Sequence, residues 1–248
     1  MMKSILMADQ SVGFEIAQWL LSEYRQDISL VVTTSENKIL DLAKQLNVDY
    51  LVFESTNQVY TAMKESNIDF DIGFLVWWPK IIKQPLLNMP RYGFINTHPS
   101  FLPHNRGKHY NFWALVEQSP FGVSLHFVED GVDNGDIVAQ DLISYDWEDN
   151  GESLYNKAQN AMVNLFKKAY PKILNLGFAR QKQDVNSGSF HLANEINKAS
   201  QINLDDTYKA RDLLNLLRAR TFPSYPACWF KDGVNEYEVR IEIKRRIL

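Results

Sequence analysis

Cysteine is almost absent from this sequence of 248 residues, since Cys228 is the only one. A single cysteine excludes both an internal disulfide and a cysteine-based metal cluster. Its neighbours Ala227 and Trp229 are apolar, so we expect a packed and unreactive thiol.

The sequence also lacks a long apolar run and an excess of positive charge. No stretch approaches the roughly 20 apolar residues of a membrane-spanning helix, and the apolar start breaks at Asp9, too early for a secretory signal. The formal net charge is −4 and the pI about 5.8, which disfavours a nucleic acid partner because phosphodiester backbones are negative. The basic run at residues 244–246 predicts only a solvated tail. We therefore expect a cytoplasmic protein with neither a membrane nor a nucleic acid as partner.

The first turn, ADQSVG at residues 8–13, lacks the GxGxxG spacing of a dinucleotide site, so a nicotinamide or flavin cofactor gains no support. Short apolar runs alternate here with amphipathic segments. Expected strands and helices cover residues 4–8, 29–34, 49–53 and 71–78, and residues 14–20, 39–46 and 59–66, respectively. This order predicts an α/β fold, a doubly wound, mostly parallel, Rossmann-like sheet with ligands at the carboxyl ends of its strands.

The second half of the chain has a different pattern. Its expected elements are strands at 93–98, 123–130 and 136–145, helices at 110–118 and 154–174, then a helix at 207–220 and strand-like runs at 226–232 and 236–244. We expect a catalytic domain over residues 1–180 and a small C-terminal subdomain, a helix plus a β-hairpin, over residues 200–248.

The strongest chemical signal is NTHPSFLPHNRG at residues 96–107, followed by Asp133 in the turn EDGVDNGD. Alternation along a strand places Asn96 and His98 on one face, and Pro99 ends the strand. The Asn96 amide can donate to a developing oxyanion, His98 can relay a proton, and Asp133 can orient His98 and stabilise its charged form. These three residues are the predicted catalytic centre, suited to acyl transfer to an amine.

Each of these residues also has a plainer interpretation. Asn96 can cap a turn, His98 can be a satisfied polar residue at a strand end, and Asp133 can be a turn former. The spacings of six and five residues between His98, His104 and His109 match no common metal-ligand motif, so we expect no metal.

The complete pattern resembles the signature of folate-dependent formyltransferases, N-x-H-P-S-x-L-P followed by a loop ending in D-x-G. The first part is matched at residues 96–103 and the second by Asp133 and Gly135. The resemblance extends over roughly residues 1–175 and more faintly after Leu204. It implies 10-formyltetrahydrofolate as the formyl donor, in a pocket lined by the segments before and after the signature. The implied donor-binding residues are Trp77, Trp78, Pro79, Lys80, Ile82, Val128, Asp130 and Asp133. Because adjacent strand residues point to opposite faces, we expect only one of Trp77 and Trp78 to face this pocket.

The family's acceptors include the amine of methionyl-tRNA, glycinamide ribonucleotide and nucleotide-linked amino-deoxysugars. The acidic chain and its short C-terminal part argue against methionyl-tRNA as the acceptor. Glycinamide ribonucleotide enzymes typically end near the long helix, so they leave residues 204–248 without an explanation. The resemblance is therefore closest to nucleotide-sugar N-formyltransferases, which implies a dTDP-amino sugar as partner and a product for bacterial surface polysaccharide such as lipopolysaccharide O-antigen. The expected acceptor-binding residues follow the signature, and they are Asn105, Arg106, Lys108, His109, Tyr110, Asn111 and Trp113.

These acceptor residues can also be an aromatic-rich helix start packed on the core. A rival of another class is a folate-binding sensor that has lost turnover, against which the intact Asn, His and Asp argue. The apolar helix at residues 212–217 and the hairpin after it are expected to pair two subunits into a homodimer.

Overall fold

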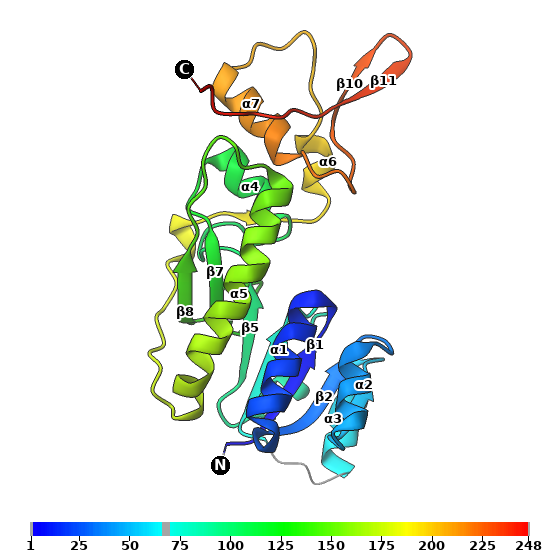
Figure 1. The fold of residues 1–248 in the computed structure, drawn as a ribbon, viewed down its shortest axis with the longest axis vertical. Helices are drawn as coiled ribbons and strands as arrows, with labels where there is room; N and C mark the ends of the chain where they lie inside the picture. Colours follow the sequence, from blue (N-terminus) through cyan, green and yellow to red (C-terminus); the bar gives the residue numbers. More distant parts are fainter. Residues whose placement is uncertain (1, 66–69, 248) are drawn as a thin grey trace. The chain divides into compact units, whose positions relative to one another are not determined.

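A computed structural model describes residues 2–65 and 70–247 (Figure 1). The strands of the described part are β1 (Ser4–Ala8), β2 (Ile28–Thr33), β3 (Tyr50–Val52), β4 (Ile72–Val76), β5 (Phe94–His98), β6 (Arg106–Gly107), β7 (Gly122–Phe127), β8 (Ile137–Leu142), β9 (Phe190–His191), β10 (Cys228–Asp232) and β11 (Asn235–Val239). The α-helices are α1 (Gln10–Glu23), α2 (Lys38–Gln45), α3 (Thr56–Glu65), α4 (Tyr110–Glu117), α5 (Gly151–Leu174), α6 (Glu195–Ala199) and α7 (Ala210–Ala219).

The chain forms two compact units, which are described separately. Unit 1 consists of Met1–His98, Ser124–Ala139 and Met162–Lys182. Unit 2 consists of Pro99–Val123, Gln140–Ala161 and Gln183–Leu248. The boundary falls within β7, β8 and α5, so these elements contribute residues to both units.

A seven-stranded sheet has the order β3-β2-β1-β4-β5-β7-β8. The pairs β1–β2, β1–β4, β2–β3 and β4–β5 are parallel, whereas β7 is antiparallel to β5. Helices alternate with the first four strands (Figure 1), as right-handed crossovers between parallel strands require. The expected α/β fold with a mostly parallel sheet is confirmed, as is the antiparallel hairpin of β10 and β11.

Apolar side chains cover both faces of the sheet in unit 1. On one face Ile5, Leu75 and Phe94 belong to a cluster completed by Val59 and Met63 of α3. On the other face Phe74 contacts Phe166 and Tyr170 of α5 at ring distances of 5.4 and 5.5 Å. Strands buried on both faces explain the continuous apolar runs that indicated a parallel sheet.

Several element ends differ from the expectation, each for a local reason. β4 ends at Val76 because Trp77 adopts a left-handed conformation with φ of 52°. α5 begins at Gly151 because Asn150 and Ser153 cap its start. The Asn150 backbone N–H donates to the Ser153 hydroxyl, and the Ser153 backbone N–H donates to the Asn150 side-chain oxygen, both at 2.9 Å, as in a capping box. Ser66, the last residue of the expected helix at 59–66, lies outside the described residues.

In unit 2 the hairpin packs on α7. Leu217 and Cys228 form a cluster with Ile202, and Leu213 and Phe230 pack against it. Cys228 is fully buried, and burial raises its pKa to about 12. The burial confirms the packed thiol expected from its apolar neighbours, and a raised pKa fits the expected low reactivity.

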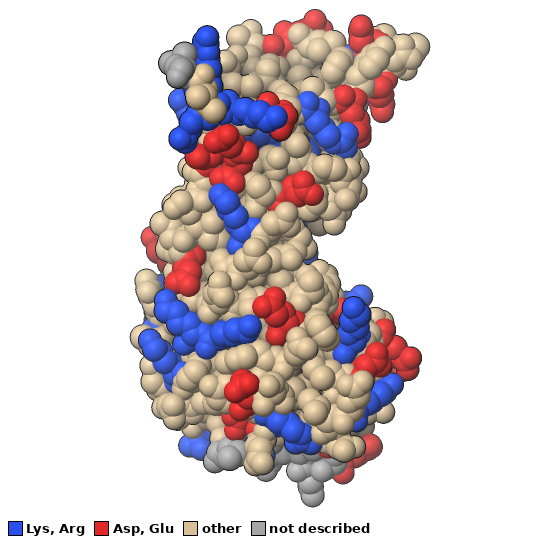
Figure 2. Space-filling model, viewed as in Figure 1, with Lys and Arg blue, Asp and Glu red and all other residues tan. Residues whose placement is uncertain are grey.

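Acidic and basic side chains are interspersed on the face shown in Figure 2. Over the described residues, no helix combines the length and apolar character needed to cross a membrane.

Candidate active site

The antiparallel pair of β5 and β7 brings three polar side chains onto one face of the sheet. Asn96 on β5 is the register partner of His126 on β7, and His98 is opposite Ser124. Register partners project to the same side of a sheet, and residues two apart on a strand do so as well. Asn96, His98 and His126 therefore share a face at the carboxyl end of β5, with both histidines at most 5% exposed.

Asp133 reaches this face from the loop between β7 and β8, residues 128–136. It adopts the left-handed conformation with φ of 51°, and Gly131 has φ of 107°. Gly135 is required by close packing, because a Cβ there would lie 2.0 Å from the carbonyl oxygen of Phe127. The Asn134 side chain donates to the Asp130 carbonyl at 2.7 Å and closes the turn. The glycine of the D-x-G motif thus lets the loop fold tightly around Asp133.

The Asp133 carboxylate lies close to all three side chains of the face. Its Oδ2 is 3.3 Å from His98 Nδ1, and its Oδ1 is 3.5 Å from His126 Nε2. The Asn96 amide donates to the same Oδ1 at 3.5 Å. The Asp133 side chain is 14% exposed, so little water screens its interaction with the imidazoles. The structure thus brings the three predicted catalytic residues together.

His126 is a site residue that the sequence did not reveal. Its Nδ1 is 2.8 Å from the Phe127 carbonyl oxygen, which can only accept, so Nδ1 carries the hydrogen. Its Nε2 is 3.1 Å from the Asn96 amide nitrogen, so the amide can donate to this ring nitrogen. His126 therefore orients the Asn96 amide. The signal for this role is the register between β5 and β7, which depends on a non-local pairing.

The four side chains can carry out proton transfer and stabilise an oxyanion. His98 holds Nδ1 toward the carboxylate, the tautomer that leaves Nε2 as the basic nitrogen. The carboxylate stabilises the imidazolium that forms when His98 takes a proton. The Asn96 amide is fixed from two sides, and a preoriented donor costs no reorganisation during reaction.

Three of the expected donor-binding side chains lie on the same sheet face as the predicted catalytic residues. Ile82, Trp78 and Val128 all belong to or pack against the cluster that contains Phe94. Phe94 precedes Asn96 by two residues and shares its face. Apolar and aromatic side chains therefore continue the face that carries Asn96 and His98.

The remaining expected donor-binding residues are close in sequence to Trp78, Ile82 and Val128, and they are half-buried or exposed. Trp77 is half-buried, and its backbone N–H donates to the Thr97 hydroxyl at 2.9 Å. Pro79, Lys80 and Asp130 are exposed. β4 ends at Val76, so Trp77 and Trp78 lie after the strand and not on it. Strand alternation therefore does not set their directions, and the expectation based on it was wrong in its premise.

The expected acceptor-binding residues lie in unit 2, where most of their side chains have partners. Asn105 is fully buried and donates to Glu117 at 2.9 Å, while Arg106 donates to the Val185 carbonyl at 3.2 Å. Lys108 is exposed. Arg106 also belongs to β6, which pairs with β9. Each of these strands has only two residues, so the sequence shows no pattern from which the pairing could be predicted.

The helix start that follows is aromatic and packed. Trp113 stacks on the His191 ring at 3.8 Å, and Asn111 donates to the Gly151 carbonyl at 2.8 Å. Burial lowers the pKa of His109 and raises that of Tyr110 well above its ordinary value. These contacts fit the packed helix start, and they leave binding of an acceptor untested.

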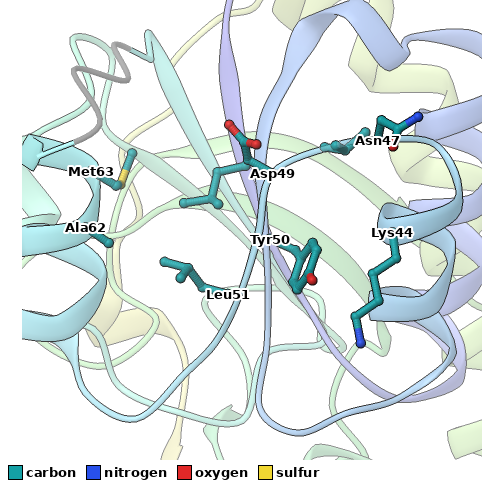
Figure 3. Close-up of a pocket in the computed structure, with 9 residues that line it drawn as sticks. Lys44, Asn47, Asp49, Tyr50, Leu51, Ala62 and Met63 are labelled. Carbon is teal, nitrogen blue, oxygen red and sulfur yellow. The ribbon is translucent and has the colours of Figure 1, made fainter.

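Two hollows lie in unit 1. One, of about 490 Å³, adjoins the carboxyl ends of β1 and β2 and is lined by polar groups such as Gln10, Ser11 and Asn37. The other, of about 590 Å³, lies at the amino end of β3 beside Lys44, Tyr50 and Met63 (Figure 3). Only the first of these two hollows lies at the carboxyl ends of the parallel strands, the edge of the sheet where His98 also lies.

A doubly wound sheet that carries an amide, two imidazoles and a carboxylate on one face is typical of a group-transfer enzyme. The chain belongs to the formyl transferase family, whose model matches residues 22–170. Residues 195–245 match the N-formyltransferase dimerization C-terminal domain. The protein is therefore a formyltransferase.

Relatives with different acceptors resemble this chain. A methionyl-tRNA formyltransferase of Finegoldia magna is 26% identical over 92% of this chain and 76% of its own length. A 4-N formyltransferase from Francisella tularensis has the same fold, with a TM-score of 0.81, 24% identity and 99% of both chains covered. An N-formyltransferase from Helicobacter canadensis, in complex with folinic acid and dTDP-3-aminofucose, gives a TM-score of 0.70 at 18% identity, covering 94% of this chain and 85% of that one.

Proposed function

We propose that this formyltransferase moves the formyl group of 10-formyltetrahydrofolate to the amino group of a nucleotide-linked amino-deoxysugar. A nucleotide-linked sugar is an activated glycosyl donor, so the product would next be consumed by a glycosyltransferase. In this proposal the product is a precursor of a bacterial surface polysaccharide such as lipopolysaccharide O-antigen, and a dTDP-linked 3- or 4-amino-6-deoxyhexose is the acceptor to test.

The contacts of Asp133 carry the proposal for the catalytic residues. The acceptor amine adds to the formyl carbon, and Asn96 donates to the oxygen that becomes negative. His98 takes the proton from the new C–N nitrogen and returns it to the departing folate nitrogen as the old C–N bond breaks. Asp133, 3.3 Å from His98, stabilises the charged imidazole between these steps.

The sheet face shared with Asn96 supports the proposal for the donor. Trp78, Ile82 and Val128 pack on one cluster there, and apolar and aromatic side chains fit a flat pterin ring. When bound, the folate supplies the activated formyl group. We propose that these residues hold it, together with Trp77, Pro79, Lys80, Asp130 and Asp133.

The C-terminal part of the chain supports a sugar acceptor. Residues 195–245 match the dimerization domain of N-formyltransferases, and the formyltransferase from Francisella tularensis is covered over 99% of its length. The Helicobacter canadensis protein, of the same fold, binds a dTDP-linked amino sugar. We keep the segment at residues 105–113 as the proposed acceptor-binding segment, in which Arg106 and Lys108 supply positive charge for a diphosphate.

Methionyl-tRNA is the second candidate acceptor, because the tRNA-modifying relative from Finegoldia magna aligns with 92% of this chain. About a quarter of that relative lies outside the match, which covers 76% of its length. Binding of tRNA also requires several phosphate contacts, which the net charge of −4 disfavours.

The test is to incubate the protein with 10-formyltetrahydrofolate and a panel of nucleotide-linked amino sugars, and to follow tetrahydrofolate release and product mass. We expect a product one formyl group heavier and a shallow dependence of KM on salt. Efficient formylation of methionyl-tRNA, strongly suppressed by salt, would replace the sugar with tRNA. Donor binding without transfer to any amine would leave a folate sensor.

We also propose that the protein is a homodimer formed through its C-terminal part. Most of the apolar face of α7 is covered by the hairpin within one chain. Leu214, Tyr225 and Tyr237 nevertheless remain between 40% and 56% exposed. Exposed aromatic and aliphatic side chains are typical of an interface core.

A further inference from the structure

The loop that carries Asp133 has an unusual charge. Glu129, Asp130, Asp133 and Asp136 place four carboxylates within eight consecutive residues. Like charges this close repel one another, and the repulsion favours a looser loop unless a cation compensates it. The position of Asp133 therefore depends on how the loop is neutralised.

Arg180 supplies positive charge at both ends of this loop. Its Nη2 lies 2.9 Å from Glu129 Oε1, and its Nε lies 3.1 Å from Asp136 Oδ2. The guanidinium carbon is 3.9 Å from the centre of the Phe127 ring, at the last residue of β7. A planar guanidinium can make these three contacts at once, whereas an ammonium group cannot.

The backbone that carries Arg180 is itself fixed. Gln181 and Ile137 exchange two backbone hydrogen bonds of 2.7 and 2.9 Å, which pair the segment after α5 with the first residue of β8. Phe178 packs against Phe127 at a ring distance of 5.7 Å. Arg180 therefore reaches the loop from a segment that is held at Ile137, the first residue of β8.

The loop between the two contacts of Arg180 is short and internally tied. Phe127 N–H donates to the Asp136 carbonyl at 2.9 Å, and the contact of Gly135 with Phe127 leaves no room for a Cβ. Movement of either end therefore carries Asp133 with it. Asp133 lies 3.3 to 3.5 Å from its partners, so a shift of about 1 Å breaks these contacts.

We propose that Arg180 is a positioning residue for formyl transfer, which holds Asp133 against His98 and His126 by neutralising Glu129 and Asp136. The inference rests on the proposed function, in which Asp133 acts through His98.

The first test is Arg180→Ala, assayed with the acceptor found above. A misplacement of about 1 Å can cost on the order of a hundredfold, so we expect kcat to fall about 10- to 100-fold with both KM values changed less than about threefold. Arg180→Lys should recover part of this loss, because one ammonium group can pair with one carboxylate at a time. Lys167→Ala is the matched control, since Lys167 is also a partly exposed, ion-paired cation of unit 1. An unchanged kcat in Arg180→Ala would overturn the proposal.

The second test places Arg180→Ala in the Asp133→Asn background. A residue that acts only through Asp133 should cause no further loss there, since residues acting as one unit are non-additive. Losses that multiply would instead show a general structural role and would also overturn the proposal.

A third measurement needs no acceptor, so it distinguishes failure of this inference from failure of the proposed function. The imidazole NMR signals of His98 and His126, assigned with the variants His98→Gln and His126→Gln, report on the nearby carboxylate. Arg180→Ala should move both signals in the direction caused by Asp133→Asn, and Lys167→Ala should leave them in place. Unmoved signals in Arg180→Ala would contradict the positioning role even if no acceptor were known.

Discussion

His98 and His126 lie on the same face of the sheet but have different hydrogen-bond partners. His98 directs Nδ1 to the Asp133 carboxylate at 3.3 Å, while His126 directs Nδ1 to the Phe127 carbonyl at 2.8 Å. A carboxylate stabilises an imidazolium, and a hydrogen-bonded carbonyl fixes one tautomer. Two identical side chains thus have different surroundings, which fit the roles proposed for them, proton relay for His98 and amide orientation for His126.

Replacement of His98 by alanine tests the proton relay. Loss of a general acid-base group costs about 100- to 10,000-fold in rate, so kcat of His98→Ala should fall within this range while donor affinity stays nearly unchanged. Stopped-flow assay of formyl transfer, with donor binding measured by fluorescence titration, provides both numbers. Retention of more than about a tenth of the rate would mean that another base replaces His98.

Replacement of His126 by phenylalanine tests the orientation of the Asn96 amide. The amide loses the acceptor that lies 3.1 Å away, and removal of such a supporting contact typically costs about 10- to 100-fold. We expect kcat to fall within that range without a change in the shape of the pH–rate profile, because His98 is the proposed proton relay. His104→Ala, a histidine of unit 2, serves as the control and should retain full activity.

At the scale of single elements, the β7–β8 loop depends on Gly135. A methyl group there would lie 2.0 Å from the Phe127 carbonyl oxygen, so Gly135→Ala must displace the loop and Asp133 with it. We expect at least about a tenfold loss of kcat with a small change in melting temperature. Gly177→Ala is the control, because its Cβ would make only an ordinary contact of 3.6 Å. Equal activity of the two variants would show that the loop adapts freely.

The start of α5 provides a test by pH. Burial acts to raise the pKa of Asp149, but hydrogen bonds from Lys157, the Asp146 backbone and Ser153 outweigh it and lower the pKa. A lowered folded-state pKa contributes stability above the unfolded-state pKa of about 3.9, and this stability is lost as the pH falls through the folded-state value.

Asp149→Asn should therefore lower the free energy of unfolding at pH 7 by about 1 to 3 kcal/mol. The difference from the unchanged protein should shrink as the pH falls below about 4. Urea unfolding at several pH values measures this. Glu236→Gln removes an exposed ion pair and should change the free energy of unfolding by less than about 1 kcal/mol at every pH.

The sequence predicted the parallel strands well, because strands such as Ser4–Ala8 and Ile72–Val76 are continuous apolar runs bounded by turns. It also predicted Asn96, His98 and Asp133 as one centre. It could not reveal His126, β6 or β9, since each depends on pairing between distant segments. Likewise, Arg180 has no local pattern, and its contacts with Glu129 and Asp136 exist only once the chain has folded.

At the scale of the whole molecule, the proposed homodimer requires that exposed apolar residues of α7 lie in the interface between the two subunits. Leu214 is 40% exposed on α7, so Leu214→Glu should place a charge in the interface and shift the protein toward monomer. Size-exclusion chromatography with light scattering measures the mass. Leu176→Glu, at a 47% exposed leucine of unit 1, should leave the mass unchanged. A monomeric protein before any substitution would contradict the homodimer.

The antiparallel register of β5 and β7 has a consequence for how this enzyme family can diversify. The residue pairs Asn96–His126 and His98–Ser124 are set by the ladder between the two strands, whatever the length of the chain that joins them. Insertions or deletions in residues 99–121 therefore leave the reacting geometry in place, while a slip of one residue within either strand would turn a catalytic side chain to the opposite face. Under the proposed function, which places acceptor binding in residues 105–113, acceptor preference can change through the joining segment while the proposed catalytic residues stay on the strands.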